Sequence, residues 1–402
     1  MGPYCTYCDH RCFVPNPIGG QRATILATCQ AGKDHDRRSL GYDIDTIRQN
    51  PDRKDPAMGA RFDTEKYRNA MIGLAAGDAW GYQVEFTTYD RLDGPVLPPE
   101  GLWLISDDTQ MTLALETALR RSEHLGVYEI TGHIVSEFIA WADSPLNDRA
   151  PGTTCMGSLR RLDEGGYPWH HPSLGAIESA GCGAVMRLLP AAMSERERWL
   201  GLTALQAVVT HRHPLAVLSA LLMGEAVRTA PLRRGHLVGN ALRTLTEIEQ
   251  GTWVGLADPM LREVLAPVTD NLTEWLGSEV PTMRAHLTAA HARLWANDVA
   301  GDPCDGVGEG WDAGTATALA LMVADAPLMP YAALQWAATS NGDSDSIAAM
   351  AGMIIGASSR EEGFWYDHDV VPIFEPVYEH AIERGRRQRW DVADNAHTMR
   401  VL

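Results

Sequence analysis

The chain has 402 residues, 45% of them hydrophobic, and its 52 acidic and 34 basic residues give a formal net charge of −18. This acidic balance argues against general binding to nucleic acid or to an anionic membrane surface, because both need basic side chains. No run of about 18 apolar residues occurs, and the first residues lack the basic and apolar regions of a secretory signal. We therefore expect a cytoplasmic protein, whose cysteines are thiols or metal ligands and not a disulfide framework.

Residues 1–50 are rich in cysteine and histidine and hold four of the chain's seven cysteines. The spacing is C-x2-C-x3-C, with a C-x5-H pair further along. Structural zinc takes four nitrogen or sulfur ligands, often from a C-x2-C turn and a distant pair. We therefore expect a small module held by one Zn2+, whose candidate ligands are Cys5, Cys8, Cys12, Cys29 and His35. Free thiols on a loosely folded arm, or a redox role, are the alternatives.

Helical periodicity dominates the chain after a linker at 51–62 that contains proline, glycine and charged residues. Apolar residues recur at helical spacing, and alternating strand patterns are scarce. The segments with this spacing are 63–81, 109–121, 128–142, 197–230, 236–250, 258–276, 279–297, 312–325, 331–339 and 346–358. We therefore predict one all-α domain over 63–390, followed by a tail at 391–402.

The first of these helices is expected to end in the glycine-rich run 73–81, with Glu85 close behind. In one interpretation the glycines allow close helix packing and a helix end, and Asp78 caps the next element. In the other, a tight loop brings Asp78 and Glu85 to the edge of a cleft. Glu85 would then position a water or accept a proton, as general-base catalysis needs.

Two acidic clusters, at 106–109 and 341–346, each precede an apolar helical segment. A single acid or serine at a helix start is most simply an N-cap. Here two acids crowd each start, and adjacent like charges are unfavourable unless a cation lies between them. Together the clusters offer an all-oxygen set suited to Mg2+ or Mn2+. The candidate metal ligands are Ser106, Asp107, Asp108, Asp343, Asp345 and Ser346.

Two loops of small residues are candidates for binding a diphosphate through backbone N–H groups. One contains Gly152 and Thr153, and the other spans 179–187. An ordinary turn at a helix start is the alternative for both. His211, in the sequence THRHP, is expected to be a hydrogen-bonding pocket residue, because no cysteine or acid lies nearby at metal-ligand spacing.

The order of these motifs resembles that of the ADP-ribosylglycohydrolases, a family that includes the dinitrogenase-reductase-activating glycohydrolases. The resemblance covers residues 63–360 through GLAAGDAWG, SDDTQMTL, APGTTC, GCGAVMR, THRHP, GEGWDA and NGDSDSIAAMAGMIIGA. It implies an orthogonal multi-helix fold, a site for two Mg2+ ions in a central cleft, and hydrolysis of the bond joining ADP-ribose to an acceptor.

The resemblance also assigns roles to particular residues. The two acidic clusters match its metal-binding motifs, and Glu85 matches a glutamate that assists at the cleft. His211 matches a histidine that faces the ligand. The residues that match the family's loops around the diphosphate and distal ribose are Gly152, Ser179, Gly181, Cys182 and Gly183.

Cleavage at the anomeric carbon of ribose passes through an oxocarbenium-like state, so the enzyme must hold the ribose and deliver a water. Two cations about 3.5–4 Å apart suit both tasks. The carboxylates of Asp107, Asp343 and Glu85 are equal candidates for completing the proton transfer.

The expected partner is an ADP-ribosylated protein or a small-molecule conjugate. An arginine linkage would favour an acid before the glycine–threonine loop, where Asp148 stands with Arg149 as a competing neighbour. Hydrolysis of small ADP-ribose esters or of ADP-ribosylated nucleic acid is an alternative activity. A catalytically silent ADP-ribose-binding protein is an alternative of a different class.

Overall fold

The computed structural model describes residues 62, 64–122, 124–165, 176–233, 235–366, 370–383 and 390, with the backbone alone at 231–233. The chain divides into two units, Met1–Pro56 and Ala57–Leu402, and every described residue belongs to the second. The zinc module predicted for 1–50, the linker up to residue 61 and the tail at 391–402 lie outside the described residues. They stay predictions, as does the zinc ligand set Cys5, Cys8, Cys12, Cys29 and His35.

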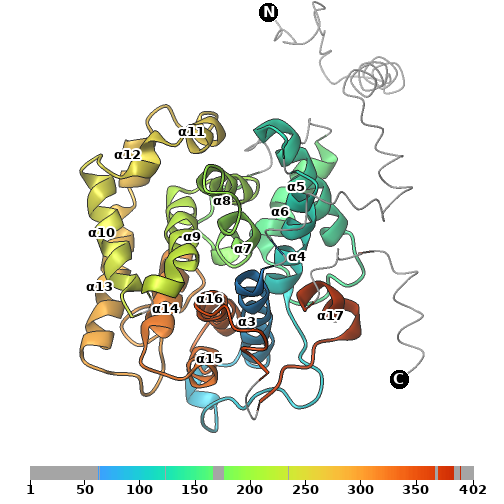
Figure 1. Ribbon diagram of the computed structural model, residues 1–402, viewed down its shortest axis with the longest axis vertical. Helices are drawn as coiled ribbons and strands as arrows, with labels where there is room; N and C mark the ends of the chain where they lie inside the picture. Colours follow the sequence, from blue (N-terminus) through green and yellow to red (C-terminus); the bar gives the residue numbers. More distant parts are fainter. Residues whose placement is uncertain are drawn as a thin grey trace, which may run out of the picture. The chain divides into compact units, whose positions relative to one another are not determined.

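The described part of the chain is helical and contains no strand, which confirms the predicted all-α class for that part. The α-helices in Figure 1 are α3 (Glu65–Tyr82), α4 (Asp107–Arg120), α5 (Val127–Ala142), α6 (Thr153–Glu164), α7 (Leu189–Ala192), α8 (Trp199–Val208), α9 (Pro214–Arg233), α10 (Leu237–Glu249), α11 (Pro259–Leu265), α12 (Leu272–Gly277), α13 (Val280–Trp295), α14 (Ala313–Asp325), α15 (Pro330–Ala338), α16 (Ser344–Ala357) and α17 (Pro376–Ile382). Three short 3-10 turns are η1 (Tyr89–Arg91), η2 (Cys182–Ala184) and η3 (Val254–Ala257).

Several element boundaries differ from the sequence prediction for local reasons. The segment expected at 197–230 is two helices, α8 and α9, because Pro214 cannot continue a helix and instead begins one. The segment expected at 258–276 likewise divides into α11 and α12. Helices α7 and α17 were not predicted, because with 4 and 7 residues they are too short to show a periodic pattern. Helix α6 was also missed, since it begins with two threonines, which are poor helix formers.

The most extensive packing between described elements is that of α3 on α16, which lie side by side in Figure 1. Glycines at every fourth position of α3 form the contact face. A Cβ atom added at Gly73, Gly77 or Gly81 would lie 2.3, 2.1 or 2.3 Å from the backbone oxygen of Gly352, Ala348 or Ser344, respectively. Such separations are far below van der Waals contact, so this packing requires glycine. This agrees with the interpretation of the run 73–81 in which the glycines allow close helix packing.

The other helices surround this central pair. Helix α15 packs on both α3 and α16, while α14 and α9 cover α16. Helix α5 packs on α4, and α13 packs on both α10 and α14. None of the helices in the described ranges is both long enough and apolar enough to cross a membrane.

Replacing Gly77 with alanine tests the close contact. The added Cβ would meet the Ala348 carbonyl, so the free energy of unfolding should fall by about 1–3 kcal/mol, the usual range for overpacking. Gly132 in α5 is the control, because a Cβ there meets no atom within 4 Å. Gly132→Ala should raise stability by about 0.5–1 kcal/mol through helix propensity. Equal effects of the two substitutions in denaturant unfolding would contradict the packing argument.

Candidate metal centre

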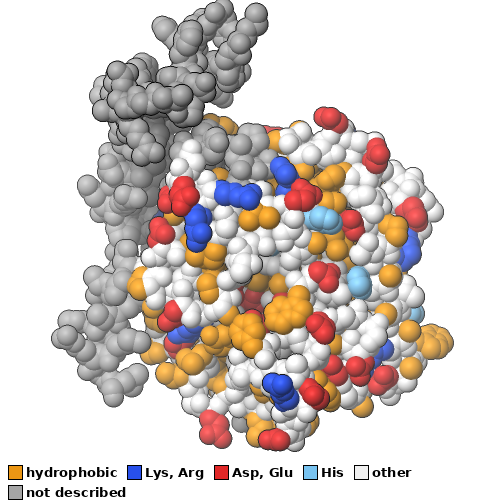
Figure 2. All heavy atoms as spheres, turned by 180° about the vertical axis from the view of Figure 1, so that it is seen from behind, with side chains coloured by type: hydrophobic (Ala, Val, Ile, Leu, Met, Phe, Trp, Pro, Cys, Tyr) orange, Lys and Arg blue, Asp and Glu red, His pale blue; other side chains and the backbone are white. Residues whose placement is uncertain are grey.

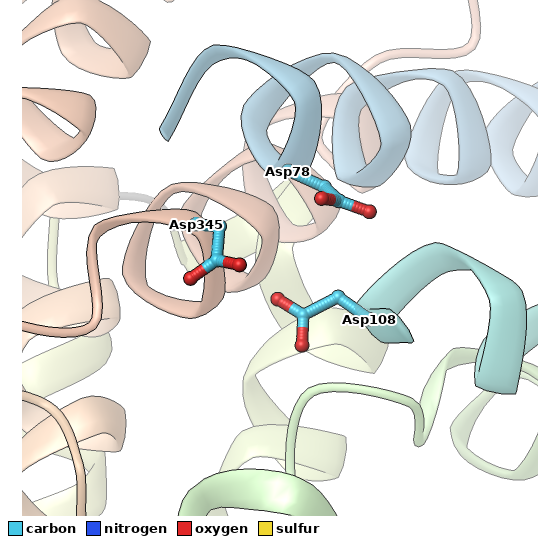
Figure 3. Close-up of side chains that lie close together, drawn as sticks. All are labelled: Asp78, Asp108 and Asp345. Carbon is cyan, nitrogen blue, oxygen red and sulfur yellow. The ribbon is translucent and has the colours of Figure 1, made fainter. Parts of the chain in front are cut away.

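Acidic side chains from three helices converge beside the α3–α16 contact. Figure 3 shows Asp78 from α3, Asp108 from α4 and Asp345 from α16 around a common space. One carboxylate oxygen of each lies within 4.8 Å of the others. A second group with the same property consists of Glu85, Asp343 and Asp345. Because the two groups share Asp345, they form one continuous carboxylate cluster.

The cluster joins the two acidic motifs of the sequence. The Ser346 hydroxyl donates to Asp108 Oδ1 at 3.1 Å, although the residues are 238 positions apart. Four of the six predicted metal ligands, Asp108, Asp343, Asp345 and Ser346, therefore lie close together. Asp107 is near enough for its charge to raise the pKa of Glu85, and Ser106 caps α4 by accepting from Asp108 N at 3.3 Å. The structure brings the predicted ligands together; their binding of metal stays a prediction.

Helix capping does not account for the acids of these motifs. At α4 the cap is the Ser106 hydroxyl, not either aspartate. At α16 the cap residue is Asp343, whose side chain makes no capping hydrogen bond. Asp343 Oδ2 instead lies 2.8 Å from Cys182 Sγ. Of the acids in these motifs, only Asp345 accepts from a first-turn N–H group of its own helix, through Oδ1 from Ser346 N at 2.9 Å, so capping explains little of the acid content of the two motifs.

Two carboxylate oxygens of the cluster are buried without a hydrogen-bond partner among the described residues. They are Asp108 Oδ2 and Glu85 Oε2. An ionised carboxylate in such a position is strongly unfavourable unless a positive charge compensates it. Carboxylate and hydroxyl oxygens are the ligands that Mg2+ and Mn2+ prefer, so the donor set fits a hard divalent cation.

The pKa values of the cluster acids also indicate that no positive charge compensates the carboxylates. Burial raises the pKa of Glu85 to about 9, with a further contribution from the charges of Asp345 and Asp107. Burial also raises the pKa of Asp343 to about 6. For Asp107, Asp108 and Asp345, burial and the neighbouring carboxylates hold the pKa well above the ordinary aspartate value.

The sequence prediction placed Asp78 wrongly, although its capping role agrees with one of the two interpretations of that segment. Asp78 lies inside α3, not in a loop or at a helix end, and is fully buried. Its Oδ1 accepts from Ser106 N at 2.9 Å, and its Oδ2 accepts from Thr109 N at 3.0 Å and from the Thr109 hydroxyl. Because both of its oxygens already accept hydrogen bonds, Asp78 mainly orients the start of α4 and is less suited to binding a metal. An acid within a helix of small apolar residues is the sequence signal for such a role.

The two predicted diphosphate loops lie next to the cluster and contact each other. Gly152 N donates to Asp107 Oδ2 at 3.0 Å, and the Thr154 hydroxyl donates to Ser179 Oγ at 3.0 Å. Several N–H groups of the loops are already engaged, since Gly181 N donates to Ser179 Oγ and Cys182 N to the Trp311 carbonyl. The first N–H groups of α6, beginning at Thr153, have no intrahelical acceptor and no side-chain cap.

His211 lies against the second loop. A Cβ added at Gly183 would come 3.1 Å from His211 Cε1, and one at Gly181 would come 3.4 Å from His211 Nε2. Burial lowers the pKa of His211 to about 3, so the imidazole is neutral. Its Nδ1 is 2.8 Å from the Thr210 hydroxyl. The geometry therefore suits a neutral hydrogen-bonding residue at the loop.

Two exposed aromatic side chains lie close in the sequence to the cluster or to its neighbouring loop. Phe86, next to Glu85, is 76% exposed and stacks on the 44%-exposed Trp311, with ring centroids 6.5 Å apart. Figure 2 shows a hollow in one face of the molecule, with acidic side chains in its depth and hydrophobic side chains at its rim.

These features define a protein whose described part is all-helical, with a buried carboxylate cluster where α3, α4 and α16 meet. The sequence pattern of the ADP-ribosylglycohydrolase family matches residues 59–364. The chain therefore belongs to the ADP-ribosylglycohydrolase family, which confirms the resemblance seen in the motifs.

Two curated relatives match part of the chain. The ADP-ribosyl-dinitrogen reductase glycohydrolase of Rhodospirillum rubrum is 35% identical over 190 residues, covering 42% of this chain and 57% of the relative. The ADP-ribosylarginine hydrolase Tri1 of Serratia proteamaculans (strain 568) is 27% identical over 172 residues, covering 40% and 46%. These matches span about half the length of either relative. A solved structure, an ADP-ribosylglycohydrolase-related protein complex, has 23% identity, a TM-score of 0.46 and coverage of 73% of this chain and 87% of its own.

Thermal stability in a chelating buffer should fall as the pH rises from about 4 to about 9. The unfolded chain ionises these carboxyl groups near 3.8 for Asp and 4.5 for Glu, whereas the folded protein retains protons on Asp343 to about pH 6 and on Glu85 to about pH 9. Since the folded state binds more protons over this window, stability that is present at acid pH is lost as the pH rises. Mg2+ or Mn2+ should restore the melting temperature, and more at high pH than at low pH.

The control for this measurement is Asp108→Asn, which removes a charge from the cluster and should reduce the gain in melting temperature on adding the metal. A melting temperature that does not respond to either cation at any pH would contradict the assignment of the cluster as a metal centre.

Proposed function

We propose that the protein is a hydrolase of ADP-ribose conjugates whose carboxylate cluster binds two Mg2+ ions, or Mn2+ in their place. The observation that carries the proposal is the pair of buried, unpartnered oxygens, Asp108 Oδ2 and Glu85 Oε2, within a cluster of five acids in a family member. When bound, such cations supply Lewis-acid chemistry, binding hydroxyl groups and lowering the pKa of a water.

The proposed ligands are Asp107, Asp108, Asp343, Asp345 and Ser346, with Ser106 supporting the start of α4. Asp107 and Asp343 are already held by polar neighbours, Gly152 N and Cys182 Sγ. Glu85 instead lies in the turn after α3, and its Oε2 has no partner in the described part of the chain. We therefore assign the proton exchange with substrate and water to Glu85, and metal binding to Asp107 and Asp343.

The diphosphate of ADP-ribose is proposed to lie at the start of α6 and along the second loop. Thr153 N is available there, and the positive end of the helix dipole favours a phosphate. The backbone of these loops can approach the diphosphate closely, because Gly152, Gly181 and Gly183 have no side chain. Ser179 Oγ orients Gly181 N by accepting its hydrogen bond. Neutral His211 would hydrogen-bond the ligand without adding charge.

An arginine-linked protein is the first acceptor to test. Both terminal nitrogens of Arg149 donate to the Glu375 carboxylate, so its competition for Asp148 is limited to a 3.7 Å contact through Nε. Asp148 is 74% exposed and is thus accessible to a guanidinium. The name of the Serratia relative supports the same acceptor.

The direct experiment measures release of free ADP-ribose from arginine-, serine-, ester- and nucleic-acid-linked conjugates, with and without Mg2+. Metal-dependent release from the arginine conjugate is expected. Release from the ester or nucleic-acid conjugate alone would transfer the assignment to the corresponding alternative. Tight ADP-ribose binding without turnover on any conjugate would support a silent binding protein and contradict the hydrolase.

Two substitutions separate metal binding from proton exchange. Asp343→Asn should abolish turnover and weaken Mn2+ binding by about 10–100-fold, because it removes a ligand charge. Glu85→Gln should lower kcat by about 10²–10⁴-fold with Mn2+ binding retained, because it removes a general acid or base. Mn2+ titration by electron paramagnetic resonance and initial rates measure both effects. Full activity of Asp343→Asn in a folded protein would refute the two-metal assignment.

A further inference from the structure

A cysteine thiol lies among the oxygens of the carboxylate cluster. Cys182 Sγ is 2.8 Å from Asp343 Oδ2 and 3.8 Å from Ser346 Oγ. The residue is fixed from its backbone, because Cys182 N donates to the Trp311 carbonyl at 3.2 Å. The thiol is thus held against two proposed ligands by the loop that carries it.

The thiol donates a hydrogen bond to Asp343, and further oxygen atoms that can bind a metal lie nearby. Ser346 Oγ lies between the thiol and the Asp108 carboxylate, with 3.1 Å to Asp108 Oδ1. The other oxygen of that carboxylate, Asp108 Oδ2, is buried without a partner among the described residues, and the residue is only 1% exposed. Figure 3 shows the Asp108 carboxylate directed toward Asp345, across the interior of the cluster.

We propose that Cys182 makes this centre a binding site for thiophilic divalent cations, Zn2+ or Cd2+, with Sγ as a direct ligand beside the carboxylates of Asp343 and Asp108. Thiolate is a soft ligand that favours these ions over Mg2+, and Zn2+ accepts mixed sulfur and oxygen ligands. On binding, the S–H bond breaks, the sulfur–metal bond forms, and one proton passes to solvent.

The consequence is competition at one centre. Mg2+ and Zn2+ are of similar size, so a purely oxygen site discriminates poorly between them, whereas a thiolate adds a preference for the softer ion. Zn2+ or Cd2+ bound through Cys182 would occupy positions that the proposed hydrolase needs for Mg2+. The inference rests on the proposed metal centre but not on catalysis, because ligation by sulfur is measured without substrate.

The test is a Cd2+ titration of the full chain, read as the thiolate-to-cadmium absorption in the ultraviolet. Wild type is compared with Cys182→Ser and with Cys304→Ser, which removes a buried thiol beside Asp302 outside the cluster. Cysteines in residues 1–50 contribute equally to all three proteins and cancel in the difference spectra. Cys182→Ser should lose one thiolate's absorption and bind Cd2+ at this centre at least about tenfold more weakly, while Cys304→Ser matches wild type.

A second measurement needs no variant at the centre and therefore does not depend on whether Cys182→Ser folds. Excess Mg2+ should remove part of the cadmium–thiolate absorption of the wild type, because the two ions compete for the same carboxylates. Equal absorption in Cys182→Ser and wild type, or a wild-type absorption that Mg2+ does not change, would overturn the proposal. Neither result would affect the hydrolase assignment, which is tested by ADP-ribose release with Mg2+ alone.

Discussion

The contact between α3 and α16 is the constraint on which the site depends. Glycines on α3 let the two backbones approach so closely that the Ser344 hydroxyl donates to the Gly81 carbonyl at 2.9 Å. Ser344 is the first residue of α16, so this contact also fixes the position of Asp345 beside α3. Because Asp78 of the same helix accepts hydrogen bonds from the start of α4, one helix sets the positions of both acidic motifs.

Collecting these acids in one buried place opposes the stability of the fold. Burial raises the pKa of Glu85, Asp108 and Asp345, and the charges of neighbouring carboxylates raise it further. Apolar packing around the cluster supplies the compensating stability, since α14 and α16 consist almost entirely of buried small and aliphatic residues. A cation that binds the folded state alone adds to that stability by mass action. Burial and the closeness of like charges lower the stability of the fold without a cation. The same two features favour the binding of a cation.

The sequence was sufficient for the helical class of the described residues and for most of the acids that the structure brings together. Two acids at the start of an apolar helix are a local signal, and both acidic motifs carried it. The position of Asp78 inside α3 was not predictable, because the glycines around it are as typical of a helix end as of close packing. Its contact with the start of α4 agrees with the interpretation in which it caps the next element. The hydrogen bond from Ser346 to Asp108 depends on how helices 238 residues apart pack, which no local pattern contains. The proximity of Cys182 to Asp343 has the same origin, and the thiol was therefore assigned to the diphosphate loop alone.

The most direct test of the central claim is anomalous diffraction from crystals grown with Mn2+. Binding by the carboxylate cluster predicts strong anomalous peaks within coordination distance, about 2.0–2.6 Å, of Asp108 and Asp345 oxygens. The peaks should be lost in crystals of Asp345→Asn that retain the same fold. An ordered cluster with no anomalous peak at saturating Mn2+ would contradict the account, because the buried carboxylates would then be stable without a cation.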